Sequence, residues 1–245
     1  MHFAGHVRPF HLRNNIAEEI TVVTENANIL AQIADIQLRL GLIEDHQEIE
    51  RLQNQYGFYL DNRMWREVSE LFCDDKPSLE IGQRGSYVGK ERVYRFLSEV
   101  LGQGRWGLLK DEIINHIQLQ MVITVASDRQ SAEMRSRALV QGNSPPGSGK
   151  MLLAEGVYEN EYVKVADIWK IKRVWWVPTF YFEVAGFDGA VFDSGPESTS
   201  FPPDIPAPPR DAGLGRRFLP FHYLHPFTGA EVASPSGAPN PKRKI

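Results

Sequence analysis

The apolar spacing changes part-way along the chain, and this change constrains the fold more than any other feature of the 245 residues. Up to about residue 101, apolar side chains recur at steps of three and four, as in helices that bury one face. Four runs with a spacing of two follow, at His116–Val125, Ser131–Gln141, Leu152–Val163 and Asp167–Val184. Short turn-forming segments join these runs, which predicts an antiparallel meander. Helices followed by strands indicate an α+β fold, and because few helices must cover long strands, we expect the sheet to curve around a cavity.

Three helices are predicted ahead of the strands. Asp45 and Glu48 fit a capping box and predict that the first helix begins there, with Asp61 and Asn62 at its end. Its apolar face consists of Ile49, Leu52, Tyr56 and Tyr59. A second short helix carries Trp65, Val68, Leu71 and Phe72, and a strand follows at residues 79–81. The inward side chains of the third helix are Val93, Phe96, Leu97 and Val100.

Composition divides the chain into three parts. Residues 1–42 hold a polar leader and a helical apolar stripe that needs something to pack on, formed by Ile29, Leu30, Ile33, Ile36 and Leu40. Residues 43–187 contain the strong strand signals and form the predicted domain. Residues 188–245 are an arm with 11 of the 16 prolines after residue 195. An aromatic cluster predicts that this arm docks over its own pocket or onto a neighbouring subunit: Phe218, Phe221, Tyr223 and Phe227.

Charge and composition argue against several classes of protein. The formal net charge of −4 and the pI near 6.0 give no basic field, so we expect no nucleic-acid partner. No run approaches the roughly 18 apolar residues of a membrane span, and the N-terminus has no signal-peptide core. The single cysteine, Cys73, cannot form an intrachain disulfide, which favours a reducing compartment. We therefore expect a cytoplasmic protein with no membrane partner.

Motifs that hold cofactors are missing from the sequence. It has no GxGxxG that opens a helix, no Walker phosphate loop, no HExxH and no GxSxG elbow. His222 and His225 have a spacing that could chelate a metal, but their coil context favours surface packing. We expect an enzyme that works with side chains alone, with no cofactor and no metal site.

Alternation along the first strand run gives one candidate. In NHIQLQMVITV one face carries His116, Gln118, Gln120 and Val122, and the other carries Ile117, Leu119, Met121 and Ile123. If the apolar set packs under the helices, His116 faces solvent. If the sheet curves around a pocket, His116 lies at its mouth.

The end of the first predicted helix gives a second candidate. The spacing of Tyr56 and Asp61 brings a phenol and a carboxylate to neighbouring positions. A buried carboxylate beside phenols can act as a general base, and a phenol can polarise a carbonyl or hydroxyl. The alternative is a tyrosine in the core and an aspartate that caps the helix.

The last strand run gives a third candidate. Strand spacing predicts that Trp169, Ile171, Arg173, Trp175 and Val177 share one face. Arg173 between two tryptophans could orient a phenolate or carboxylate, or it could lie along aromatics on the exterior of the sheet. The predicted substrate-binding set is Arg173, Trp175, Trp169, Tyr87 and Gln118.

The stretch from about Ile43 to Phe187 resembles the SnoaL-like branch of the nuclear transport factor 2-like superfamily. Four segments carry the resemblance: IEDHQEIERLQNQYGFYLDNRMWREVSELFCDD, GSYVGKERVYRFL, NHIQLQMVITVASDRQSAEMRSRALV and GVYENEYVKVADIWKIKR. The resemblance implies a cone-shaped α+β barrel with a curved antiparallel sheet covered by N-terminal helices. The family includes scytalone dehydratase, bile-acid dehydratase, isomerases, cyclases and cofactorless formaldehyde lyases.

The resemblance also implies roles for individual residues. Dehydratases of this group place a Tyr and an Asp near the end of the first helix, which match Tyr56 or Tyr59 with Asp61, and a His at the start of a central strand, which matches His116. The chain lacks a second mid-domain histidine, which argues against a two-histidine elimination.

The function implied is a cofactor-independent lyase that eliminates water or formaldehyde from a hydrophobic phenolic or polycyclic aromatic substrate, for example a lignin-derived diaryl compound. An isomerase or cyclase of the ketosteroid-isomerase type, or a non-catalytic binding or assembly module, is the alternative. Family members often form dimers or trimers, so we expect a homo-oligomer.

Overall fold

The chain divides into two compact units, residues 1–45 and 46–245. The computed structural model describes residues 10–143, 146–187, 198–206, 213–214 and 221–233, with side chains from residue 23 onward. The predicted boundaries at residues 42 and 187 remain predictions. No helix in these described ranges is long and apolar enough to cross a membrane.

The first helix, α1 (Phe10–Asp61), is continuous over 52 residues, so the predicted helix start at Asp45 is wrong. The segment before Asp45 contains good helix formers and no proline. Its single glycine, Gly41, costs a helix only about 1 kcal/mol and does not end it. The capping-box residues therefore lie in the interior of a helix. Before residue 41 every described side chain of α1 is exposed.

Shorter helices complete the helical part of the second unit. They are α2 (Trp65–Glu70), the 3-10 turn η1 (Gly82–Arg84), α3 (Lys90–Arg95) and the π-helical turn η2 (Phe96–Leu101). Val93, Phe96 and Leu97 are buried as predicted, whereas Val100 is exposed. The prediction for Val100 is wrong because the wider π turn shifts side chains away from α-helical spacing.

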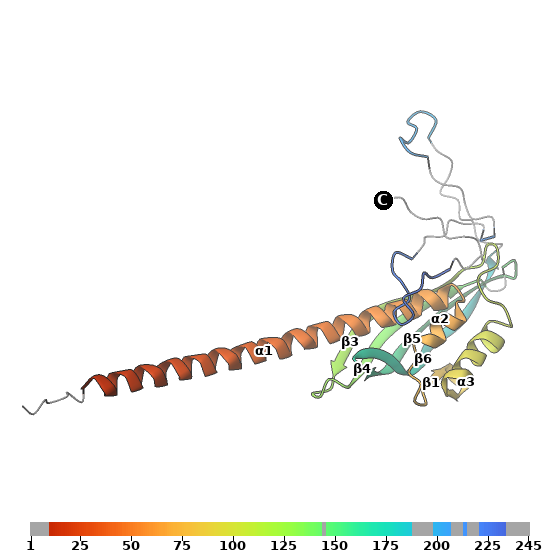
Figure 1. The fold of residues 1–245 in the computed structure, drawn as a ribbon. Helices are drawn as coiled ribbons and strands as arrows, with labels where there is room; N and C mark the ends of the chain where they lie inside the picture. Colours follow the sequence, from red (N-terminus) through yellow and green to blue (C-terminus); the bar gives the residue numbers. More distant parts are fainter. Residues whose placement is uncertain (1–9, 144–145, 188–197, 207–212, 215–220, 234–245) are drawn as a thin grey trace, which may run out of the picture. The chain divides into compact units, whose positions relative to one another are not determined.

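Six strands form one curved sheet that does not close, with the order β2-β1-β6-β5-β4-β3 (Figure 1). The strands are β1 (Ser78–Ile81), β2 (Ser86–Val88), β3 (Ile114–Val125), β4 (Ser131–Gly142), β5 (Gly149–Val165) and β6 (Ile168–Phe187). β3 to β6 form the predicted antiparallel meander. The β1–β6 pair is parallel, which corrects the expectation of a wholly antiparallel sheet. The α+β class is confirmed.

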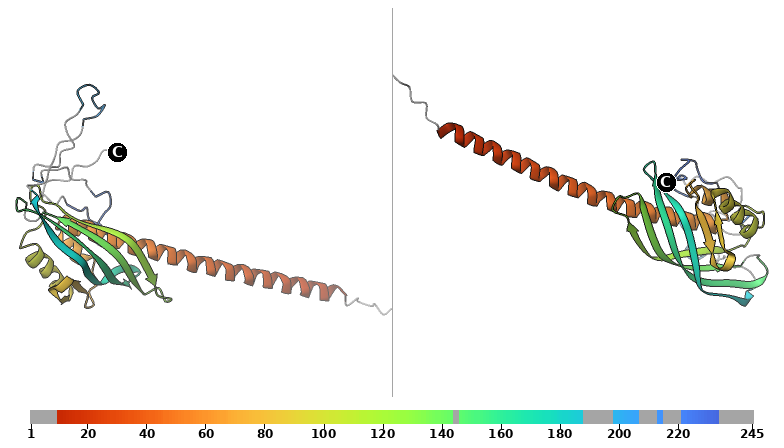
Figure 2. Two further views of the ribbon diagram at one scale, coloured as in Figure 1. Left: turned by 180° about the vertical axis from the view of Figure 1, so that it is seen from behind. Right: turned by 90° about the horizontal axis from the view of Figure 1, so that it is seen from below.

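One face of the sheet packs against α2, α3 and the part of α1 that belongs to the second unit (Figure 2). The buried residues of α1 include Ile49, Leu52, Tyr56 and Tyr59, which are the positions predicted for its apolar face. We call the helix-covered face of the sheet the inner face and the opposite face the outer face.

Residues 221–233 also pack on the core. Phe221 meets Tyr59 edge to face, with ring centroids 5.6 Å apart, and Lys170 lies 4.9 Å from the Phe227 ring. This part of the arm therefore packs on its own domain, but none of its residues lines a cavity described below, so docking over the pocket or onto a neighbouring subunit remains a prediction. Phe218 lies outside the described residues.

Candidate functional site

The end of α1 and the edge strand β3 meet at a carboxylate–imidazole pair. Asp61 Oδ1 lies 2.7 Å from His116 Nδ1. The same oxygen accepts a hydrogen bond of 2.7 Å from the main-chain N–H of His116. The side chains are 18% and 16% exposed, so the pair is held in place and still reaches solvent. We call Asp61 and His116 the dyad.

The hydrogen bond assigns a chemical role to each imidazole nitrogen. An ionised carboxylate accepts hydrogen bonds and cannot donate them, so His116 Nδ1 carries the proton toward Asp61. In the neutral ring the other nitrogen, Nε2, then keeps its lone pair. This arrangement can take a proton from a bound molecule at Nε2 while Asp61 stabilises the resulting imidazolium.

A buried ion pair sets the approach of β3 to the end of α1. Arg63 follows the helix and Glu112 precedes the strand, and their Nη2 and Oε1 atoms lie 2.8 Å apart. Glu112 also accepts a hydrogen bond of 2.8 Å from the Leu109 main-chain N–H. Because a buried charge without its partner is costly, this link strongly favours one position of the strand relative to the helix. The same link therefore holds Asp61, at the end of the helix, close to His116 on the strand.

A cavity of about 360 Å³ lies beside the dyad. Its walls come from two elements, α1 with Asn54, Gly57, Phe58 and Asp61, and β3 with Asn115, His116, Ile117 and Gln118. A Cβ atom at Gly57 would lie 2.8 Å from Gln118 Nε2, closer than atoms in proteins normally approach. The missing side chain at Gly57 therefore lets Gln118 lie against the helix.

A buried hydrogen-bond network holds Gln118. Gln53 donates to Gln118 Oε1 at 2.8 Å and accepts from the Tyr162 hydroxyl at 2.7 Å. Asn160 donates to the same Gln53 oxygen at 3.0 Å. The network ties α1, β3 and β5 together, and it leaves Gln118 Nε2 with no hydrogen-bond partner among the described residues.

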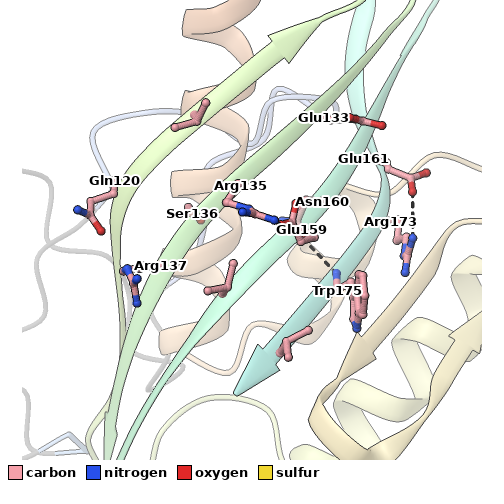
Figure 3. Close-up of a pocket in the computed structure, with 13 residues that line it drawn as sticks. Gln120, Glu133, Arg135, Ser136, Arg137, Glu159, Asn160, Glu161, Arg173 and Trp175 are labelled. Atoms are coloured by element: carbon pink, nitrogen blue, oxygen red, sulfur yellow. Dashed lines mark hydrogen bonds and ion pairs between the residues drawn. The ribbon is translucent and has the colours of Figure 1, made fainter. Parts of the chain in front are cut away.

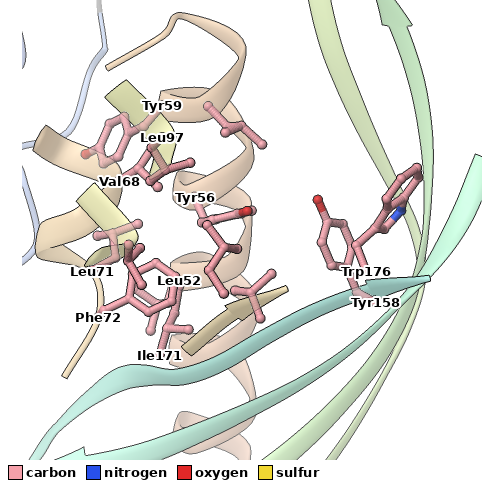
Figure 4. Close-up of a cluster of buried hydrophobic side chains, with 14 of the residues drawn as sticks. Leu52, Tyr56, Tyr59, Val68, Leu71, Phe72, Leu97, Tyr158, Ile171 and Trp176 are labelled. Atoms are coloured by element: carbon pink, nitrogen blue, oxygen red, sulfur yellow. The ribbon is translucent and has the colours of Figure 1, made fainter. Parts of the chain in front are cut away.

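Two phenols lie deeper, between α1 and the sheet. Tyr56 projects from α1 and Tyr158 from β5 into the same space, with ring centroids 6.3 Å apart (Figure 4). Burial raises the pKa of both, and the nearby Asp61 carboxylate adds to the rise. Both phenols therefore stay protonated at neutral pH and are available as hydrogen-bond donors.

Several polar atoms on this inner side lack partners. Within the described ranges, no hydrogen bond reaches Gln118 Nε2, Trp176 Nε1 or Ser136 Oγ, whereas the Tyr56 and Tyr158 hydroxyls lie close enough to interact with each other. Buried polar groups are normally paired, so an unpaired set of this kind needs an explanation such as a bound molecule. Gly156 leaves room for the Trp176 indole, because a Cβ there would lie 2.6 Å from its ring.

Tyr59 is not brought to the dyad. Tyr59 points away from Tyr158 and Trp176 (Figure 4), and its ring stacks on His225 at a centroid distance of 5.9 Å. Burial raises the pKa of Tyr59, but its neighbours are the aromatic residues of the arm. The geometry therefore favours Tyr56 over Tyr59 as the partner of the dyad.

A β-bulge in β3 corrects the predicted faces of this strand. Gln120 and Met121 both lie opposite Ser136, and Gln120 has a φ of 54°. His116 and Gln118 face inward before the bulge, whereas beyond it Met121 and Ile123 are on the inner side and Val122 is exposed. The predicted faces are right up to Leu119 and wrong after it. His116 faces the helix, as in the pocket interpretation.

A second irregularity separates Arg173 from the dyad. Lys172 is an extra residue between the pairs Tyr162–Ile171 and Glu161–Arg173, so the side chains change face at this point. Ile171 is buried, whereas Arg173 and Trp175 lie on the outer face (Figure 3). The prediction that Trp169, Ile171, Arg173, Trp175 and Val177 share one face is therefore wrong.

The outer face has its own hollow, of about 690 Å³, in which each of the three arginines pairs with a glutamate. Arg173 lies 3.1 Å from Glu161 and 4.6 Å above the Trp175 ring. Arg135 pairs with Glu159, and Arg137 with Glu155. These arginines therefore have carboxylate partners within the protein, and Glu133 also lines the hollow.

The two remaining predicted binding residues are also away from the dyad. Trp169 is 2% exposed in the core, with Lys164 Nζ 5.0 Å from its ring. Tyr87 stacks on Phe96, with ring centroids 4.1 Å apart. Of the predicted substrate-binding set, only Gln118 lines the cavity beside the dyad.

Sequence reasoning missed some contributors to the site and misjudged His225. Helical spacing from Ile49 reaches Gln53, alternation along the strand could have found Tyr158, and Trp176 could be placed only once the extra residue in β6 was known. His225 is 3% exposed and its Nε2 lies 3.3 Å from Glu70, so it is a core residue rather than a surface one. No group of three potential metal ligands occurs among the described residues.

The architecture defines the class of protein first: an α+β fold in which one face of a curved, open sheet is covered by helices and carries an Asp–His pair at its edge. Residues 42–174, more than half of the chain, match the model of the SnoaL-like domain, so the chain belongs to the SnoaL-like family. The resemblance seen in the sequence is confirmed. No curated protein gives a significant match.

Solved structures share the fold at low identity. Hexachlorocyclohexane dehydrochlorinase LinA type 2 matches with a TM-score of 0.54 and 21% identity, over 63% of this chain and 98% of that one. LinA type 3 from Novosphingobium barchaimii matches with a TM-score of 0.52 and 19% identity, over 60% of this chain and 95% of that one. A protein provisionally named scytalone dehydratase, from Novosphingobium aromaticivorans, matches with a TM-score of 0.50 and 20% identity, over 64% of this chain and 97% of that one. The relatives thus include proteins named for lyase reactions.

Proposed function

We propose that this protein is a cofactor-independent lyase in which His116 is the general base and Asp61 holds and stabilises it. The observation that carries the proposal is the 2.7 Å contact between Asp61 Oδ1 and His116 Nδ1 beside a cavity. General acid–base catalysis by a positioned side chain contributes about 10² to 10⁴ in rate. The names of the LinA and scytalone dehydratase relatives support an elimination reaction.

The reaction that suits this arrangement is a β-elimination. His116 Nε2 takes a proton from a carbon of the substrate, the C–H electron pair forms the new double bond, and the bond to the leaving group breaks. Water leaves when the leaving hydroxyl receives a proton. Formaldehyde leaves in a related step: a base takes the proton of a hydroxymethyl group, the O–H electron pair forms the carbonyl of formaldehyde, and the electron pair of the broken carbon–carbon bond forms the new double bond as a protonated hydroxyl leaves the adjacent carbon as water.

Tyr56 is the proposed hydrogen-bond donor to the oxygen on which negative charge develops. Burial raises the pKa of this phenol, so it remains a donor at neutral pH. Hydrogen-bond donors that are already in place where charge develops are often the largest contribution to catalysis. Tyr158 and Trp176, which share the space with Tyr56, supply further donors and aromatic surface.

The proposed substrate is a hydrophobic phenolic or polycyclic aromatic compound, for example a lignin-derived diaryl compound. Phe58 in the cavity wall and the deeper rings of Tyr56, Tyr158 and Trp176 favour an aromatic ring, and the unpaired donors Gln118 Nε2 and Trp176 Nε1 favour an oxygen substituent on it. An isomerase of the ketosteroid-isomerase type would use the same base, returning the proton to another carbon instead of expelling a group.

The experiment is a screen of phenolic and diaryl compounds without added cofactor, with release of formaldehyde and formation of a new double bond as readouts. We expect turnover by the wild type and by His46→Ala, a matched histidine removal at an exposed position of α1, and loss in His116→Ala. Compounds that bind with no turnover would overturn the lyase and favour a binding module. A proton shift with no group released would favour the isomerase.

A further inference from the structure

The first unit carries an apolar stripe that the catalytic proposal does not use. On α1, Ile29, Ile33, Ile36, Leu40 and Ile43 are 45–61% exposed, although they follow one another at steps of four and three. A helix that buries no side chains is marginal in water, because most helical stability comes from packing of an apolar face. A stripe of this length therefore calls for a partner helix.

The spacing is that of a coiled coil. In the sequence the steps of three and four run from Val22 through Asn26 to Ile43, which makes three heptads. Asn26, Ile33 and Leu40 take the a positions, and Ile29, Ile36 and Ile43 take the d positions. Isoleucine at both kinds of position favours three strands over two, and a single Asn at an a position fixes the register.

The charges beside the stripe select a second copy of the chain in parallel orientation. In a parallel, in-register pairing, Arg39 at a g position faces Glu44 at the following e position of the neighbouring helix, and the reverse pair forms as well. Arg39 has only a distant pair on its own helix, with Asp35 at 3.8 Å. The stripe is thus complementary to itself in charge as well as in shape.

The antiparallel alternative lacks this complementarity. If the same apolar layers are aligned in opposite directions, Arg39 faces Gln32 and Glu44 faces Val23, so no opposite charges meet. We propose that residues 22–43 form a parallel coiled coil between copies of this chain. The proposal names a surface for the homo-oligomer expected from the sequence, and it does not depend on the catalytic role of the dyad.

Disulfide trapping in the full-length chain tests the proposal. Ile43→Cys places a thiol at a d position, where parallel in-register helices bring two copies together. Leu38→Cys is the matched control, because Leu38 is 51% exposed and lies on another face of the same helix. The native Cys73 is buried, so the wild type measures any disulfide formation that does not involve the introduced cysteine. We expect a species of twice 27.8 kDa from Ile43→Cys after mild oxidation, and none from Leu38→Cys.

A second pair of variants shows that the apolar stripe causes the contact. Leu40 and Leu38 are 52% and 51% exposed, so Leu40→Glu and Leu38→Glu add the same charge at equal exposure. Added to Ile43→Cys, Leu40→Glu is expected to slow disulfide formation at least about tenfold, and Leu38→Glu to leave it unchanged. Equal trapping at positions 43 and 38, no trapping at either, or equal effects of the two glutamates would overturn the proposal.

Discussion

The two faces of the sheet each carry a cavity, and it is the smaller one that contains the Asp61–His116 pair. The outer hollow, of about 690 Å³, is lined by arginines and glutamates that neutralise one another. The inner cavity, of about 360 Å³, is half that size but has an imidazole oriented by a carboxylate. Oriented groups with an unused lone pair or donor, rather than volume, indicate which face performs chemistry.

The largest difference between the faces is expected from removal of one basic side chain on each. His116→Ala should lower kcat at least about a hundredfold, since the general base is lost. Arg173→Ala should leave kcat/KM within about twofold, because Arg173 faces outward and pairs with Glu161. Steady-state kinetics on a compound from the screen measures both. An equal loss in the two variants would place substrate on the outer face.

A smaller difference separates the two tyrosines of α1. Tyr56→Phe should lower kcat about tenfold with little change in KM, because it removes a donor that acts on developing charge. Tyr59→Phe removes a hydroxyl from a ring that stacks on His225, and kcat should stay unchanged. The reverse ranking would make Tyr59 the donor.

Gly57→Ala separates the geometry of the inner cavity from stability. The new Cβ would displace Gln118, so kcat/KM should fall several-fold. Alanine in place of glycine in a helix interior contributes up to about 1 kcal/mol, so the melting temperature should not fall. A lower melting temperature with unchanged kinetics would show that Gln118 has no role in binding.

Buried phenols make the inner side sensitive to alkaline pH. Burial raises the pKa of Tyr56, Tyr158 and Tyr162 in the folded state, whereas unfolded tyrosines ionise near the ordinary pKa of about 10. The stabilisation is therefore complete below about pH 10 and is lost as the pH rises toward the folded-state pKa. Urea midpoints at about pH 8 and about pH 11 should show this decrease, and Tyr158→Phe should reduce it. A midpoint that is constant in the wild type would contradict the burial of these hydroxyls.

The sequence predicted most of the elements and named both members of the Asp61–His116 contact, but it did not predict the faces of the long strands. Helical spacing and alternation are local signals, so the helices and the four-stranded meander could be predicted. Asp61 and His116 were named together because of the resemblance to the SnoaL-like family, not because of a local pattern. The extra residues in β3 and β6 depend on pairing with neighbouring strands, which no local pattern encodes. For this reason His116 and Gln118 were correctly placed on one face, whereas Arg173 and Trp175 do not share a face with Trp169 and Ile171 as predicted.

The C-terminal half of α1 was predicted and its start was not. A capping box indicates a helix start only where the preceding residues are not helical. The apolar stripe from Ile29 to Ile43 has helical spacing, which indicates that the helix begins before Asp45. Likewise His225 lies in a segment that looks like coil. Its burial against Tyr59 comes from tertiary packing of the arm, which composition cannot reveal.

The central claim is that Asp61 makes His116 a base, and Asp61→Asn tests it most directly. Asparagine can still accept the hydrogen bond from the His116 main-chain N–H through its oxygen, so the strand stays in place. It does not supply the charge that stabilises the imidazolium. For a compound turned over by the wild type, we predict at least about a hundredfold lower kcat at an unchanged melting temperature. A kcat equal to that of the wild type would contradict the account.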